Sequence, residues 1–113
     1  MKEKNVFEKI VAGELPCKKV LENQDFLAFE DINPKAPVHV LVIPKVGVKD
    51  FNAITPELMA NMSAFVLEVV QVLGIQEKGY RLITNVGSDG GQEVPHLHFH
   101  ILGGAKLTWS KLH

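Results

Sequence analysis

The chain has 113 residues, 46% of them hydrophobic, and its 12 basic and 13 acidic side chains leave a formal net charge of -1. This length suits one domain with a buried core, and the balanced charge excludes a nucleic acid polymer as a partner while leaving a nucleotide-sized ligand possible. Because it has no long apolar run, no apolar signal region and only one cysteine, Cys17, we expect a cytoplasmic protein without a membrane span, an intrachain disulfide or a thiolate metal site.

The first third of the chain predicts a short helix and a β-hairpin. Asn5 suits the N-cap of an amphipathic helix over residues 6–12, which Gly13 ends. Phe7 and Ile10 share its buried face, where they either pack in the core or form the wall of a ligand pocket. Two apolar runs at 18–21 and 26–29 flank a turn-like segment and predict paired strands, and residues 30–37, with two prolines, predict a loop.

The middle of the chain predicts a buried strand and a long helix. Residues 38–44 are apolar apart from His39, which indicates a central strand covered on both faces. His39 is then either a satisfied core residue or a support for other histidines. Thr55 and Pro56 begin a helix that Gly74 ends.

The long helix is more apolar than one sheet face requires. Its core stripe is expected to comprise Leu58, Met62, Phe65, Val66, Val69 and Leu73. Further apolar residues extend beyond this stripe, namely Met59, Leu67, Val70 and Val72. We expect a second subunit to bury this remainder in a homodimer, the alternative being a helix packed under loops.

The last third predicts two strands around a glycine-rich loop. Residues 80–86 form the fourth strand, and the loop at 87–92 either turns the chain or lets backbone N–H groups approach a phosphate. A fifth strand follows between Pro95 and the glycine pair at 103–104, which bound it.

Three histidines dominate the fifth strand. They alternate with apolar residues in the order His96, Leu97, His98, Phe99, His100, Ile101. One face of an extended strand therefore presents three imidazoles about 6.6 Å apart, while the other face packs. Because the histidine pKa lies near neutrality, this face favours titration, nucleophilic chemistry or metal ligation over a merely hydrated surface.

Residues 96–102 match the His-φ-His-φ-His-φ-φ motif of the histidine triad (HIT) family, in which φ is apolar. The chain is similar to the Hint branch, the histidine triad nucleotide-binding proteins, from about residue 6 to residue 104, including 29–32, 38–45 and 85–92. The resemblance implies a single α+β domain over 1–113, with an arm at 1–5 and a tail at 105–113. It also implies a five-stranded antiparallel sheet, a short N-terminal helix and a long helix, with the sheet continued across a homodimer.

The resemblance further implies a purine nucleoside phosphoramidase that needs neither a metal nor a cofactor. Such proteins bind purine nucleoside monophosphates and hydrolyse AMP or GMP conjugates, including adenosine 5'-phosphoramidate and the acyl-phosphate bond of aminoacyl adenylates. By position, His98 is the nucleophile and becomes a nucleotidyl-histidine that water hydrolyses. His100 donates to the phosphate oxygens, while His39 and His96 hold the array in register.

The remaining nucleotide-binding residues also follow from the resemblance. Asn85 and Gln92 match positions that contact the phosphate or its bridging atom, and Asp31 matches a carboxylate that accepts from ribose hydroxyls. The positions around the base and along the binding loop match Phe7, Ile10, Phe29, Ile32, Gly91, Glu93 and Val94.

The chain departs from the family pattern in two places. Many Hint members carry serine at the position of Glu93, so this carboxylate either points away, works protonated as an acid or changes the preferred leaving group. The tail differs around Trp109, which either reaches the partner's active site or anchors the C-terminus. Two alternative functions stay open, a nucleotide-binding interaction module with vestigial catalysis and a histidine-ligated zinc protein.

Overall fold

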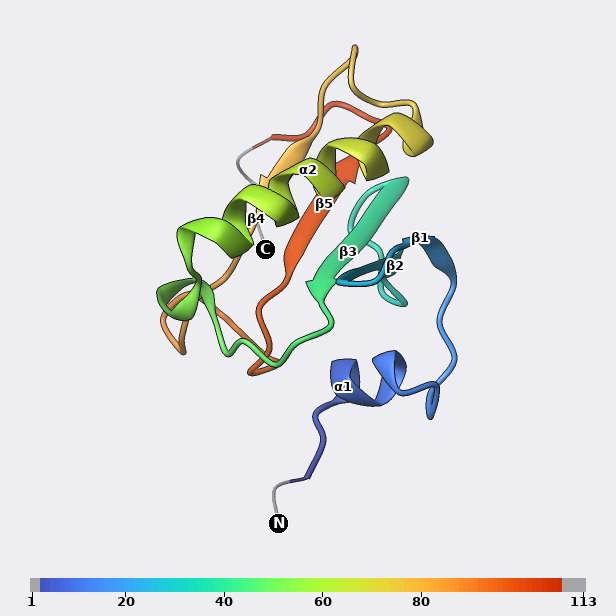
Figure 1. Ribbon diagram of the computed structural model, residues 1–113. Helices are drawn as coiled ribbons and strands as arrows, with labels where there is room; N and C mark the ends of the chain where they lie inside the picture. Colours follow the sequence, from blue (N-terminus) through green and yellow to red (C-terminus); the bar gives the residue numbers. More distant parts are fainter. Residues whose placement is uncertain (1–2, 109–113) are drawn as a thin grey trace.

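The computed structural model describes residues 3–108, which form two α-helices, a short 3₁₀ helix and five strands (Figure 1). In chain order these are α1 (Val6–Val11), β1 (Lys19–Glu22), β2 (Phe26–Glu30), β3 (Val38–Pro44), η1 (Phe51–Ala53), α2 (Pro56–Leu73), β4 (Arg81–Ile83) and β5 (Phe99–Gly103). The strands make one antiparallel sheet in the order β1-β2-β3-β5-β4, which confirms the predicted α+β class. Trp109 lies outside the described residues.

Capping residues determine where both helices begin and where α2 ends. The Asn5 side chain accepts a hydrogen bond from the Glu8 backbone N–H at 2.8 Å, and the Glu8 carboxylate accepts from the Asn5 N–H at 2.9 Å. This reciprocal pair is a capping box. In α2 the Thr55 side chain accepts from the Leu58 N–H, and Gly74, at φ 70°, ends the helix in the left-handed conformation. The predicted helix starts are therefore confirmed.

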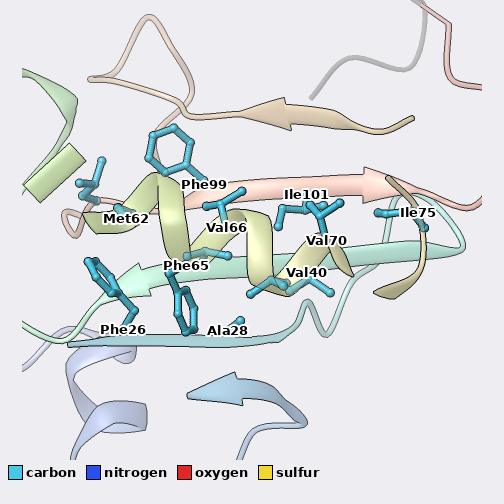
Figure 2. Close-up of a cluster of buried hydrophobic side chains, with 13 residues drawn as sticks. Phe26, Ala28, Val40, Met62, Phe65, Val66, Val70, Ile75, Phe99 and Ile101 are labelled. Atoms are coloured by element: carbon cyan, nitrogen blue, oxygen red, sulfur yellow. The ribbon is translucent and has the colours of Figure 1, made fainter. Parts of the chain in front are cut away.

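Helix α2 packs across one face of the sheet and forms the larger core (Figure 2). Five of its side chains are buried, namely Met62, Phe65, Val66, Val69 and Val70. They meet strand residues such as Phe26, Ala28, Val40, Phe99 and Ile101. By length and composition alone α2 is also apolar enough to cross a membrane, a property that core helices share with membrane spans. In this fold one of its faces covers the sheet.

The other face of the sheet carries a smaller core beside α1. It comprises Phe7, Leu27, Phe29, Leu41 and Ile43. Neighbouring residues of β2 belong to different cores because successive side chains of a strand point to opposite faces. Strand β3, in the middle of the sheet, is therefore buried from His39 to Pro44, as predicted.

Two predicted strands are shorter in the structure. Strand β4 ends at Ile83 rather than at residue 86, and β5 begins at Phe99 rather than at His96. The β4–β5 pairing stops where Ile83 faces His100, so the segment 96–98 lies outside the sheet ladder. The Leu97 N–H bonds instead to the carbonyl of Val48. The predicted alternation nevertheless holds, since Leu97 joins Phe99 in the larger core.

One prediction for α2 was wrong. Val70 is only 1% exposed and belongs to the core, because it lies one helical turn after Val66 on the buried face. Leu67 and Val72 do lie outside that face, with 60% and 59% of their surface exposed.

Candidate active site

One pocket gathers three of the four predicted catalytic histidines and some of the predicted nucleotide-binding residues. The loop after β2, strands β3, β4 and β5 and the loop before β5 all contribute to it. Its lining comprises Asp31, Asn33, Lys35, His39, Ile83, Asn85, Gly91, Glu93, His98, His100 and Leu102. His100 faces away from α2, because its neighbours Phe99 and Ile101 point into the larger core. The pocket therefore opens on the face of the sheet opposite α2.

The backbone of His96 sets the tautomer of His98. His98 Nδ1 lies 2.7 Å from the carbonyl oxygen of His96. A carbonyl oxygen only accepts hydrogen bonds, so Nδ1 holds the proton of the neutral ring and Nε2 holds none. Burial lowers the pKa of His98 because it disfavours the charged ring. An imidazole with an unprotonated Nε2 is therefore present at neutral pH.

A second chain of hydrogen bonds sets the tautomer of His100. The backbone N–H of Lys35 donates to His39 Nδ1 at 3.0 Å, so the neutral His39 ring holds its proton on Nε2. His39 Nε2 then donates to His100 Nδ1 at 2.9 Å, which leaves the proton of His100 on Nε2. Burial, followed by the charges of His98 and His39, lowers the pKa of His100 to about 4. His100 is thus a neutral donor beside His98, with ring centroids 5.2 Å apart.

The hydrogen bonds that link Lys35, His39 and His100 also disfavour a metal ion at this site. Asp31, His39 and His100 each offer a ligand atom, and these atoms lie within 4.8 Å of one another. Ligation through His39 Nε2 would require that nitrogen to lose its proton while the Lys35 N–H still occupies Nδ1. A metal could therefore bind there only after the Lys35 backbone moved, and the observed hydrogen bonds favour proton donation along the chain.

His96 supports the site from outside the pocket. Its ring is 1% exposed, and its Nε2 donates to the carbonyl of Pro44 at 2.8 Å. Phe7 approaches the rings of His96 and His98 edge to face, with centroid distances of 5.9 and 5.0 Å. The triad histidines therefore occupy two environments, with His98 and His100 at the pocket and His96 in the interior.

The structure brings only some of the predicted nucleotide-binding residues to the pocket. Asp31, Asn85, Gly91 and Glu93 line it. The predicted residues that do not line it are Phe7, Ile10, Phe29, Ile32, Gln92 and Val94.

Their surroundings give the physical reasons. The Gln92 side chain accepts from the Gly87 N–H and donates to the carbonyls of Lys49 and Val94, so its expected phosphate contact would require breaking these bonds. Phe7 and Phe29 are buried in the smaller core, with Ile10 and Val94 packed against it. Ile32 is 91% exposed and follows Asp31, which lines the pocket.

Two residues that orient the site histidines were not predicted from the sequence. The Lys35 backbone N–H orients His39, and the Thr84 hydroxyl donates to the carbonyl of His98 at 2.8 Å. No residue pattern marks a backbone donor such as that of Lys35. Thr84 had a weak signal, since it is a hydroxyl residue near the end of a predicted strand.

Several known proteins are similar to this chain in sequence and in fold. The family model of the HIT domain matches residues 12–107. A HIT-like protein of Helicobacter pylori is 69% identical over 102 residues, covering 90% of this chain and 98% of its own length. A HIT family hydrolase from Legionella pneumophila has a similar structure, with a TM-score of 0.90 at 44% identity and coverage of 96% of this chain and 99% of its own. A histidine triad nucleotide-binding protein from Candida albicans matches with a TM-score of 0.81 at 33% identity, covering 87% and 73%. The chain therefore belongs to the HIT domain family.

Proposed function

We propose that this protein hydrolyses the P–N bond of purine nucleoside phosphoramidates such as adenosine 5'-phosphoramidate, and the acyl-phosphate bond of aminoacyl adenylates. This function is the one implied by the resemblance to the Hint branch. The pair of tautomers at the pocket supports it most directly. His98 offers an unprotonated Nε2 as nucleophile, and His100 offers an Nε2–H as donor next to it.

The reaction proceeds in two displacements. His98 Nε2 attacks the phosphorus, the P–N bond to the amine breaks, and the departing nitrogen takes up a proton from solvent. Water then attacks the phosphorus of the nucleotidyl-histidine, whose bond to Nε2 breaks, and this step releases the nucleoside monophosphate, returns one proton to solvent and restores neutral His98. In both steps His100 Nε2–H donates to the phosphoryl oxygens as negative charge develops on them.

The rim of the pocket suits the nucleoside. Asp31 already accepts a hydrogen bond from the Asn33 backbone N–H at 2.8 Å, and its carboxylate has further lone pairs for ribose hydroxyls. Ile32 presents an almost fully exposed apolar side chain to a base. These positions favour a nucleotide whose phosphate lies between His98 and His100.

The proposal is tested by incubating the protein with adenosine 5'-phosphoramidate, in the presence and absence of EDTA, and measuring the release of AMP by chromatography. We expect turnover that the chelator does not reduce, since His98 and His100 supply the nucleophile and the donor. AMP binding without turnover would instead support an interaction module with vestigial catalysis. Turnover that EDTA removes and zinc restores would support a metal protein.

We also propose that the protein is a homodimer, whose second copy covers α2 and β4. An apolar hollow lies between these elements, lined by Met59, Met62, Ser63, Val66, Leu67, Tyr80, Leu82 and Phe99. Leu67 and Leu82 are 60% and 44% exposed there, and β4 is an edge strand of the sheet. An edge strand beside an apolar surface suits a strand and helix from a second copy.

The dimer is tested by replacing Leu67 with glutamate. By sedimentation equilibrium we expect the wild type at twice the 12.5 kDa chain mass and Leu67→Glu at the chain mass, because a charge in an apolar interface is costly. Val46→Glu is the matched control, since Val46 is also exposed, at 55%, but does not line the hollow. A monomeric wild type, or a dimeric Leu67→Glu, would contradict the proposal.

A further inference from the structure

We propose that Asn5, the N-cap of α1, is a positioning residue for the nucleophile. Its side-chain amide holds the His96 ring, and the His96 backbone in turn orients His98. This inference rests on the proposed function, in which His98 attacks the phosphorus. It gives the first turn of α1 a role in catalysis beyond its packing in the smaller core.

The Asn5 amide meets one partner on each side. Its oxygen accepts from the Glu8 N–H at 2.8 Å, and its nitrogen lies 3.4 Å from His96 Nδ1. His96 Nε2 donates to the carbonyl of Pro44, so in the neutral ring Nδ1 is the nitrogen that accepts. Only one orientation of the amide satisfies both partners. The flipped amide would set its oxygen against the bare Nδ1 and its NH₂ group against the Glu8 N–H.

The His96 ring is therefore held at both of its nitrogens, by the Asn5 side chain on one side and the Pro44 carbonyl on the other. The segment 96–98 precedes β5 and lies outside the sheet ladder, so single contacts hold its peptide groups. The peptide group between His96 and Leu97 is held by the Leu97 N–H, which donates to the carbonyl of Val48, and the two bonds of the His96 ring add a second anchor at the same residue. The carbonyl of His96 accepts from His98 Nδ1 at 2.7 Å. Rotation of residue 96 would move that carbonyl, and with it the support for the reactive His98 tautomer.

The neighbouring turn of α1 reinforces the same arrangement. Phe7 lies two residues after Asn5 and contacts the rings of both His96 and His98 edge to face. The start of α1 thus touches the two histidines through one hydrogen bond and two ring contacts. A shift of this turn would reach His98 directly and through His96.

Two substitutions separate the capping role of Asn5 from its contact with His96. Asn5→Ser keeps an oxygen for the Glu8 N–H but is too short to reach His96. Asn5→Asp also keeps the cap and places an acceptor where His96 Nδ1 needs a donor. With adenosine 5'-phosphoramidate we expect both variants to lower kcat by roughly tenfold, because small misplacements of a reacting group are costly. KM should stay within about twofold, because the residues that line the pocket are unchanged.

Glu8→Ala is the matched control. It removes the carboxylate that accepts from the Asn5 backbone N–H, and it leaves the Asn5 amide facing His96. We expect a fall in Tm at least as large as that of the Asn5 variants, which keep the cap, with kcat within about twofold of the wild type. Equal losses of kcat in the Glu8 and Asn5 variants would show that only helix stability matters, and this would overturn the proposal.

Ring nitrogen chemical shifts of His96 and His98, measured by NMR, give a readout that needs no substrate. In the wild type we expect His98 protonated on Nδ1 alone, and in Asn5→Ser a mixture of tautomers. Identical shifts in the two proteins would overturn the inference. A wild type without turnover, in which Asn5→Ser still changes the tautomer, would refute the phosphoramidase proposal and leave the positioning role supported.

Discussion

His98→Ala is expected to abolish phosphoramidase turnover, with kcat reduced by roughly 10⁴-fold or more. The effect is the largest we predict because this change removes the atom that forms the bond to phosphorus, and the unprotonated nitrogen of the neighbouring His100 is already occupied as a hydrogen-bond acceptor. His100 cannot take over, since His39 donates to its Nδ1 and its Nε2 holds the proton. The rate of AMP release, measured with substrate in excess, gives the result.

A second variant separates the loss of the nucleophile from a loss of structure. In His98→Asn the side-chain NH₂ can still donate to the carbonyl of His96, which keeps the local hydrogen bond while removing the attacking nitrogen. Both variants should lose turnover, and mass spectrometry of the wild type quenched in alkaline denaturant, in which a histidine P–N bond survives, should find a nucleotidyl group on His98. A variant that kept a tenth of the wild-type rate would show that another group attacks the phosphorus.

The elements of the fold were predictable because each has a local signal. Asn5 and Thr55 cap helices, Gly74 ends one, and the apolar run of β3 indicates a central strand. Strand ends were less predictable, because β5 begins only where a partner strand offers its hydrogen-bonding groups. His96 continues the alternating pattern of the strand, yet it lies beyond the last pair with β3.

The candidate site was predictable in its residue types and less so in its geometry. Alternation placed His98 and His100 together, and the family resemblance added Asp31 and Asn85. The tautomers, however, depend on backbone groups distant in sequence or unmarked by residue type, such as the Lys35 N–H. Gln92 is the opposite case. Its residue type suggested a phosphate contact, but in the structure its side-chain amide is hydrogen-bonded to backbone groups of Gly87 and Lys49.

The same dependence on tautomers predicts that His39 acts without touching substrate. His39→Leu removes the donor to His100 Nδ1, so the proton of His100 is no longer confined to Nε2. We expect kcat for adenosine 5'-phosphoramidate to fall on the order of 100-fold, in line with the loss of one oriented donor to the phosphoryl oxygens.

His39→Gln should restore most of the lost activity, because the glutamine NH₂ can donate from about the position of the histidine Nε2. Both variants fill the buried site, where His39 is 6% exposed, so their melting temperatures serve as the control for packing. If the hydrogen bond to His100 is what matters, kcat is high in the variant that has a donor at this position and low in the variant that lacks one, whatever their melting temperatures. A glutamine variant as slow as the leucine variant would show that His39 contributes through the shape or charge of its ring, and that His100 does not need a fixed tautomer.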